Sequence, residues 1–161
     1  MNKKGLSLIE IVLVIVILGI AMLPLLITYA NVITRGMNRE AISVAGSLAE
    51  ELMEEIESKN YDNNPESPWT QKQNLGPDGT ETRETFNDVD DFEGWSENPI
   101  PGFSGYSSSV EVYYVKPKNL DDINPEPPIG PTEYTDFKKI IVTVTHSQAG
   151  EIKLVSVRQG Y

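Results

Sequence analysis

The chain has 161 residues and a formal net charge of −11, from 24 acidic and 13 basic side chains. A surface this acidic repels phosphate backbones, so the composition excludes the usual basic nucleic-acid interface. The sequence has no cysteine and one histidine, which excludes disulfides and thiolate metal sites and disfavours a Ser-His-Asp triad. Since no nucleophile motif or phosphate-binding loop is present either, we expect a protein that is not an enzyme.

The amino-terminal segment combines a short basic leader, MNKKG, with a long apolar run. Residues 11–27 are all apolar or neutral, and as a helix they would be about 25 Å long. With the flanking residues from 6 to 28, this segment is long enough to span a membrane. Lys3 and Lys4 precede it, so the positive-inside rule predicts that the amino end stays in the cytoplasm and the rest of the chain lies across the membrane.

A second helical pattern follows in residues 41–59, where apolar side chains recur at the spacing of an amphipathic helix and glutamates occupy the other side. The apolar positions are Ala45, Leu48, Ala49, Leu52 and Ile56. No strong breaker separates this segment from the apolar run, so we expect one long helix from about residue 6 to residue 59. Pro24 predicts a kink in it, because proline removes one backbone hydrogen bond.

Residues 60–109 are rich in Asn, Asp, Gly and Pro, which predicts a long polar connection with little regular structure. Six aromatic side chains are candidates for anchoring this connection to a core: Trp69, Phe86, Phe92, Trp95, Phe103 and Tyr106.

An acidic cluster lies within the same connection. Its members are Asp88, Asp90, Asp91 and Glu93. Carboxylates are the hard oxygen ligands that calcium prefers, although the spacing differs from that of a twelve-residue EF-hand loop. Two interpretations stay open, a calcium site and a solvated acidic loop with aspartate caps. Apart from calcium, we expect no cofactor.

Three segments near the carboxyl end alternate apolar and polar side chains as β-strands do: residues 108–116, 138–146 and 151–158. In the second of them, Ile140, Val142 and Val144 share one face. The turn sequence HSQAG predicts a hairpin between the last two segments.

Three antiparallel strands need an apolar partner, and the stripe of the 41–59 helix is the one that the sequence offers. We therefore expect an α+β fold, in which a small antiparallel sheet packs on the second half of a long amino-terminal helix.

Glu10 is the only charged residue between positions 5 and 34. The stretch KGLSLIE at residues 4–10, followed by IVLVIVILGIAMLP, resembles the processing site of type IV pilins and type II secretion pseudopilins. The resemblance implies that a prepilin peptidase of the membrane cleaves between Gly5 and Leu6 and then methylates the new amino terminus. Leu6 departs from the family, which usually has phenylalanine at that position.

The same resemblance gives Glu10 a role in assembly. Cleavage creates an α-amine at Leu6 that is positively charged at neutral pH. In the family, the glutamate pairs with the amine of an adjacent subunit, and such a pair is far stronger in apolar surroundings than in water. Residues 6–30 would then contact other pilin or pseudopilin subunits and would lie in the inner membrane before assembly.

Two further stretches extend the resemblance. SLAEELMEEIESKNYD at residues 47–62 resembles the distal helix of minor pilins of the PilV/MshD kind, and FNDVDDFEGW at residues 86–95 resembles an acidic patch of MshD-like proteins. The implied organisation is a leader, an assembly helix, its amphipathic continuation and a globular head: residues 1–5, 6–30, 31–60 and 61–161. The implied location is the bacterial inner membrane, with a single span and the head in the periplasm or outside, and then the pilus or cell surface.

Three functions stay open at this point. The first is a minor type IV pilin, assembled into a pilus or at its tip. The second is a minor pseudopilin of a type II secretion system. The third is a secreted soluble binding module whose residues 1–30 are an ordinary signal peptide, cut after Ala30.

Overall fold

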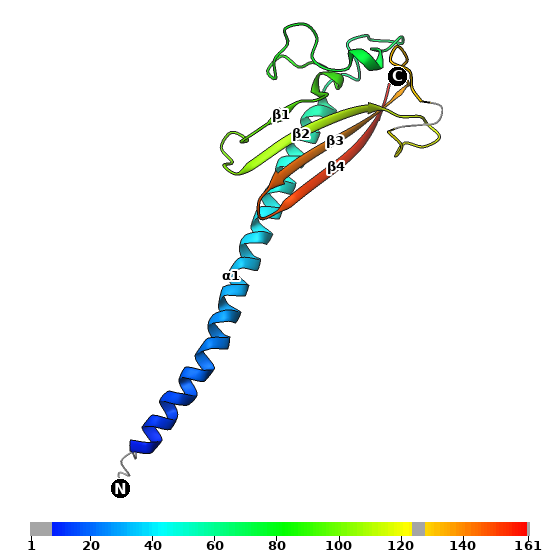
Figure 1. Ribbon diagram of the computed structural model, residues 1–161. Coiled ribbons are helices and arrows are strands. Elements are labelled where there is room, and N and C mark those ends of the chain that lie inside the picture. Colours follow the sequence, from blue (N-terminus) through cyan, green and yellow to red (C-terminus); the bar gives the residue numbers. More distant parts are fainter. Residues whose placement is uncertain (1–7, 124–127, 161) are drawn as a thin grey trace. The chain divides into compact units, whose positions relative to one another are not determined.

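The computed structural model describes residues 8–123 and 128–160 (Figure 1). The described residues form one α-helix, α1 (Leu8–Ser58), and short 3-10 helices at Lys72–Asn74 and Asp90–Phe92. The strands are β1 (Ser96–Glu97), β2 (Tyr106–Tyr114), β3 (Phe137–His146) and β4 (Gly150–Gln159). The chain divides into two compact units, residues 1–40 and residues 41–161, which are described separately below.

In the first unit, the described residues form one uninterrupted stretch of α1. By length and composition this helix can cross a membrane, because an 18-residue window within it has a mean hydropathy of 3.1 and none of that window is buried. Pro24 lies inside the helix and does not end it. The hydroxyl of Thr28 donates a hydrogen bond to the carbonyl of Pro24 at 2.8 Å, one turn back.

In the second unit, the carboxyl-terminal part of α1 buries one face. The buried side chains are Ala41, Ala45, Leu48, Ala49, Leu52, Met53 and Ile56. This set contains every position of the predicted apolar stripe. The helix ends where the Ser58 hydroxyl donates to the carbonyl of Glu55 at 2.6 Å and the Lys59 amide donates to the carbonyl of Ile56 at 3.2 Å.

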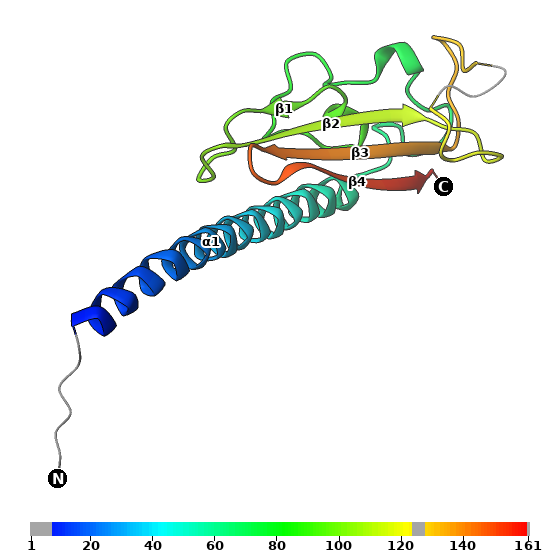
Figure 2. The same ribbon diagram turned by 60° about the horizontal axis from the view of Figure 1, so that its bottom comes forward.

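The four strands form one antiparallel sheet in the order β1-β2-β3-β4 (Figure 2). Val110 lies opposite Val142, which in turn lies opposite Leu154, so apolar residues of three strands line up on one face. The predicted α+β fold is confirmed, with the sheet packed on the helix. The two-residue strand β1 was not predicted.

One core joins the helix stripe to the inner face of the sheet. The sheet contributes Val110, Val112, Ile140, Val142 and Val144, all at most 1% exposed. Burying side chains of this size stabilises a fold by about 1.5–3 kcal/mol each. The polar connection closes the core with a second set of side chains: Phe86, Val89 and Phe92.

The aromatic side chains of the connection differ in burial. Trp69, Phe86 and Phe92 are buried as expected, and the two phenylalanine rings meet edge to face with centroids 5.1 Å apart. Phe103 is 41% exposed, so it covers the core less than an anchor would. Tyr106, by contrast, stacks on His146 at 4.2 Å between ring centroids.

Candidate functional site

Glu10 lies in the first turn of α1 and its side chain is exposed. Within the part of the first unit that the structure describes, no cation is placed to form an ion pair with it. A carboxylate near the centre of a bilayer costs roughly 2.5–3.5 kcal/mol on insertion scales. A cation supplied from outside this helix would offset that cost. Gly5 and Leu6, the predicted cleavage residues, lie outside the described residues.

The rest of this helix segment presents apolar side chains on all sides. The large apolar residues from Leu8 to Ile33 are between 45% and 81% exposed. Exposed apolar patches much larger than a few hundred Å² mark contacts with a membrane or with another protein. The segment therefore needs an apolar environment, which lipid or the helices of other subunits can provide.

In the second unit, the structure brings Asp88 and Asp91 together around the 3-10 helix Asp90–Phe92. The Asp88 carboxylate accepts hydrogen bonds from the amides of Asp90 and Asp91 at 3.0 and 3.2 Å. The Asp91 carboxylate accepts from the amides of Asn87 and Asp88 at 2.8 and 3.1 Å. Both side chains therefore stabilise the turn by accepting hydrogen bonds from its backbone amides.

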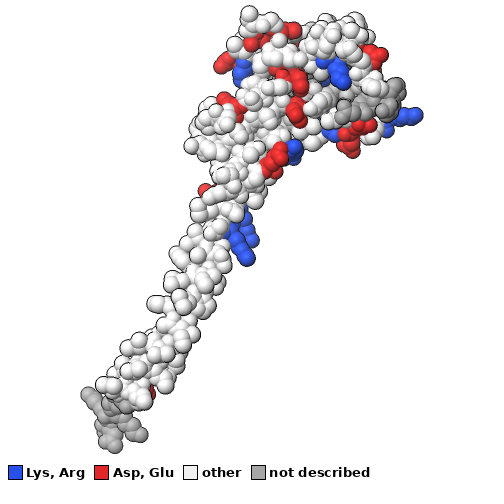
Figure 3. Space-filling view, in the orientation of Figure 1, with Lys and Arg blue, Asp and Glu red and all other residues white. Residues whose placement is uncertain are grey.

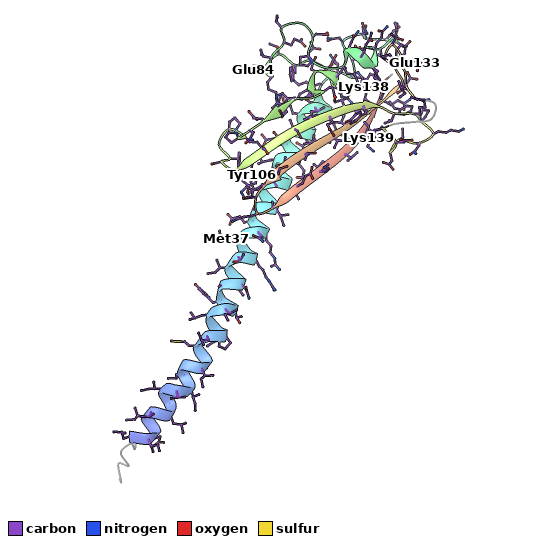
Figure 4. All side chains as sticks on the ribbon, in the orientation of Figure 1. Met37, Glu84, Tyr106, Glu133, Lys138 and Lys139 are labelled. Atoms are coloured by element: carbon purple, nitrogen blue, oxygen red, sulfur yellow. The ribbon has the colours of Figure 1, made fainter. Side chains whose placement is uncertain are left out.

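Asp90 faces a buried cation that the sequence analysis did not identify. The Lys138 ammonium is fully buried and lies 2.5 Å from Asp90 Oδ1 and 3.0 Å from Asp62 Oδ2. It also donates to the carbonyl of Tyr61 at 2.7 Å, so all three of its protons have acceptors. Figure 4 shows Lys138 and its neighbour Lys139 on β3. Strands alternate their side chains, so Lys138 shares the inner face with Ile140.

Backbone amides and the Lys138 ammonium all donate hydrogen bonds to the Asp62 carboxylate. It accepts hydrogen bonds from the amides of Thr70 and Asn64 at 2.8 and 3.0 Å, besides the contact with Lys138. Burial works to raise the pKa of Asp62, but the two amides and the ammonium together hold it below its ordinary value. Asp62 is therefore charged at neutral pH and balances Lys138.

The pKa of Asp88 is shifted in the opposite direction to that of Asp62. Burial, together with the neighbouring carboxylates of Asp90 and Asp91, raises the pKa of Asp88 to about 8. Burial also raises the pKa of Glu93, whose carboxylate accepts a hydrogen bond from the amide of Val112 on β2. At neutral pH the cluster thus keeps Asp88 mostly protonated.

Of the four calcium candidates, Asp88, Asp90 and Asp91 lie together, and Glu93 is directed to the backbone of β2. Within residues 8–123 and 128–160, no group of three or more acidic or histidine side chains is arranged to hold a metal ion. Calcium binding by these four residues stays a prediction.

The amino-terminal segment is also the part of the chain that matches a known family. Residues 1–26 match the family described as the prokaryotic N-terminal methylation motif. The chain carries a prepilin-type N-terminal motif. This motif supports a type IV pilin or pseudopilin precursor that is processed by prepilin peptidase and assembles with other subunits of that kind. Among curated proteins and among solved structures, none matches the chain at a significant level.

Proposed function

We propose that the protein is a minor type IV pilin, a structural subunit that is stored in the inner membrane, cleaved after Gly5 and then assembled into a pilus or at its tip. The observation that carries this proposal is the prepilin-type motif of residues 1–26 in direct continuity with an exposed apolar helix. In this proposal the head lies in the periplasm before assembly, because Lys3 and Lys4 hold the amino end in the cytoplasm.

Assembly follows from the physical chemistry of the helix. The apolar segment leaves lipid without exposure to water if it packs against equivalent helices of other subunits. Glu10 then gains a cation, because cleavage leaves a charged amine at Leu6 of the neighbouring subunit. The pair sets the axial position of one subunit against the next.

A minor pseudopilin of a type II secretion system has the same motif and the same helix. Deletion of the gene separates the two functions. Loss of pili or of a pilus-dependent activity supports the pilin, and loss of enzyme secretion with pili intact supports the pseudopilin.

Mass spectrometry of the mature amino terminus tests the shared part of the proposal. We expect N-methyl-Leu6 in cells with prepilin peptidase and an uncleaved leader in cells without it. Gly5→Val should block cleavage, whereas Gly19→Ala, at a helix glycine with open space around it, should be processed normally. Recovery of assembled protein that still carries residues 1–5 would contradict the proposal, as would a terminus at Asn31, which indicates an ordinary signal peptide.

A further inference from the structure

Lys138 and Asp90 carry the two chemical groups that form an amide bond, and they are in contact inside the second unit. The Lys138 side chain is 0% exposed and that of Asp90 is 5% exposed. Lys138 Nζ lies 2.5 Å from Asp90 Oδ1, and because a C–O bond is about 1.23 Å long, Nζ lies within about 3.7 Å of the carboxyl carbon. Reacting atoms in near-attack geometry are about 3–3.5 Å apart, so a small movement of the amine is enough for bond formation.

Both side chains extend from backbone that is held by hydrogen bonds. Lys138 lies on β3 between Tyr114 of β2 and Arg158 of β4, so its strand is paired on both sides. Asp90 begins the 3-10 helix Asp90–Phe92, and its amide donates a hydrogen bond to the Asp88 carboxylate at 3.0 Å. The two groups therefore stay in contact for as long as the second unit is folded, which gives a slow reaction time to proceed.

The surroundings of the ammonium are aromatic and closed to bulk water. Lys138 Nζ lies 4.4 Å from the ring centroid of Tyr61 and 5.6 Å from that of Tyr114, and both residues are at most 9% exposed. Figure 3 shows many other charged side chains of the second unit at its surface, where water solvates both members of an ion pair. A neutral amide costs less to bury than two ions, so burial favours condensation of this pair over the separated charges.

A second carboxylate is placed to move a proton. Asp62 Oδ2 lies 3.0 Å from Lys138 Nζ and can accept a proton from the ammonium. The backbone amides and side chains of Asn64 and Thr70 donate four other hydrogen bonds to Asp62, so this carboxylate stays hydrogen-bonded when the charge of Lys138 is lost. Asp88, mostly protonated because burial raises its pKa to about 8, shares a hydrogen bond with Asp90 and stabilises negative charge on its oxygen.

We propose that Lys138 and Asp90 condense into an isopeptide bond that joins β3 to the 3-10 helix Asp90–Phe92. The ion pair described above is the reactant. Lys138 passes one proton to Asp62, and the free amine attacks the carboxyl carbon of Asp90. A C–N bond forms, one C–O bond breaks, and the departing oxygen leaves as water with the proton returned by Asp62 and a second proton from the nitrogen.

The reaction balances without any other reagent. One ammonium and one carboxylate give one amide and one water, with no change in net charge and no oxidant or cofactor. The bond supplies a covalent link to a chain that has no cysteine, and it stabilises the fold by closing a loop from residue 90 to residue 138 in the unfolded chain. Both groups lie in the unit of residues 41–161, so the reaction needs neither cleavage of the leader nor assembly.

Mass spectrometry of the natural chain tests the bond. A chain made in cells without prepilin peptidase keeps its leader in the proposed function, and its mass then follows from the sequence. We expect a measured mass about 18 Da below that value, which is the loss of one water. A full-length chain of unreduced mass would overturn the inference and would leave the proposed function untouched.

Digestion with trypsin locates the bond and does not depend on the amino terminus. Trypsin separates residues 84–118 from residues 119–138 when Lys138 is free, because it cuts after an unmodified lysine. It does not cut after an acylated lysine. We therefore expect one branched fragment that joins residues 84–118 to residues 119–139, and its fragment ions should place the branch at Asp90.

Three results of the digestion would overturn the inference. The first is recovery of the two segments as separate linear fragments. The second is a branch from any other residue, including one from residues 60–72, which carry Asp62. The third is a loss of water without a branch, which indicates a cyclic imide at another aspartate or asparagine.

A matched pair of variants provides the control. Lys138→Arg keeps a buried cation, but its guanidinium stays protonated and does not attack a carboxyl group, so this variant should have the full mass. Lys139→Arg changes the neighbouring lysine, which pairs with the exposed Asp121, and should keep the loss of one water. A loss of water in Lys138→Arg, or its absence in Lys139→Arg, would contradict the assignment to Lys138.

Discussion

Lys138 and Asp90 form an ion pair of 2.5 Å whose side chains are at most 5% exposed, and the same ammonium lies 3.0 Å from Asp62. The Lys138 ammonium thus links β3 to the 3-10 helix Asp90–Phe92 and, through Asp62, to the loop that follows α1. Buried ions are stabilised only when every proton and lone pair is used, and here the amides of Asn64 and Thr70 complete the shell around Asp62.

Replacing Lys138 with methionine should destabilise the protein by about 3–5 kcal/mol, because two carboxylates lose their buried cation. Urea unfolding of the detergent-solubilised chain, followed by tryptophan fluorescence, measures the change. Lys139→Met is the matched control. The Lys139 ammonium pairs with Asp121, a side chain that is 97% exposed, so its loss should cost less than about 1 kcal/mol. Equal costs for the two variants would contradict the role given to Lys138.

The raised pKa of Asp88 predicts how stability depends on pH. Between the ordinary value of 3.8 and about 8, the folded protein holds a proton on Asp88 that the unfolded chain releases. The contribution of Asp88 is therefore complete below pH 3.8 and is lost as the pH rises through 8. Asp88→Asn keeps the Oδ1 acceptor and should make the fall in unfolding free energy from pH 5 to pH 8 shallower. An unchanged slope in this variant would show that another group is responsible.

Glu10→Val tests the assembly role of the carboxylate. Insertion and cleavage should proceed normally, since the apolar span is only made more apolar. Incorporation into filaments should fall to background, because the amine of the neighbouring subunit has no partner. The control is Glu40→Val, which removes an exposed acid outside the predicted span. Immunoblots of sheared filaments measure incorporation, and immunoblots of membranes measure insertion and cleavage. Normal incorporation of Glu10→Val into filaments would contradict the pairing role of Glu10.

Gly160 is a packing position at the carboxyl end. A Cβ atom there would lie 2.8 Å from Trp69 Cζ2 and 2.8 Å from Tyr61 Cε1. Gly160→Ala should therefore destabilise the protein by about 1–3 kcal/mol through overpacking. Gly46→Ala, inside α1 with open space around its Cβ position, should instead stabilise by roughly 0.5–1 kcal/mol. In thermal unfolding we expect a lower melting temperature for Gly160→Ala and a higher one for Gly46→Ala. A lower melting temperature for both variants would contradict this account.

The first half of α1 could be predicted from the length of its apolar run. Its second half and the sheet could be predicted because their apolar side chains recur with the periods of 3.6 and 2 residues. β1 could not, since two residues carry no period, and Ser96 and Glu97 pair with β2 only through their backbones. A signal for Lys138 was present in the sequence. It has the same parity as Ile140 and Val142 along β3, which places it on the inner face.

The partners of Lys138 could not be predicted from the sequence. Asp62 and Asp90 lie 76 and 48 residues away along the chain, and no local pattern relates positions so far apart. The acidic cluster was noticed as a set of oxygen ligands, but the sequence does not tell which oxygens accept backbone amides and which face a cation. That distinction needs the turn geometry around Asp90–Phe92.

The position of Lys138 late in the chain has a consequence for biosynthesis. While the ribosome has made only the first 137 residues, Asp62 and Asp90 have no ammonium between them, and the apolar stripe of α1 lacks β3 and β4. Non-local contacts of this kind form late. A nascent subunit therefore leaves the apolar stripe of α1 uncovered until β3 and β4 have been made, and we expect prematurely terminated copies to be open to proteases and chaperones.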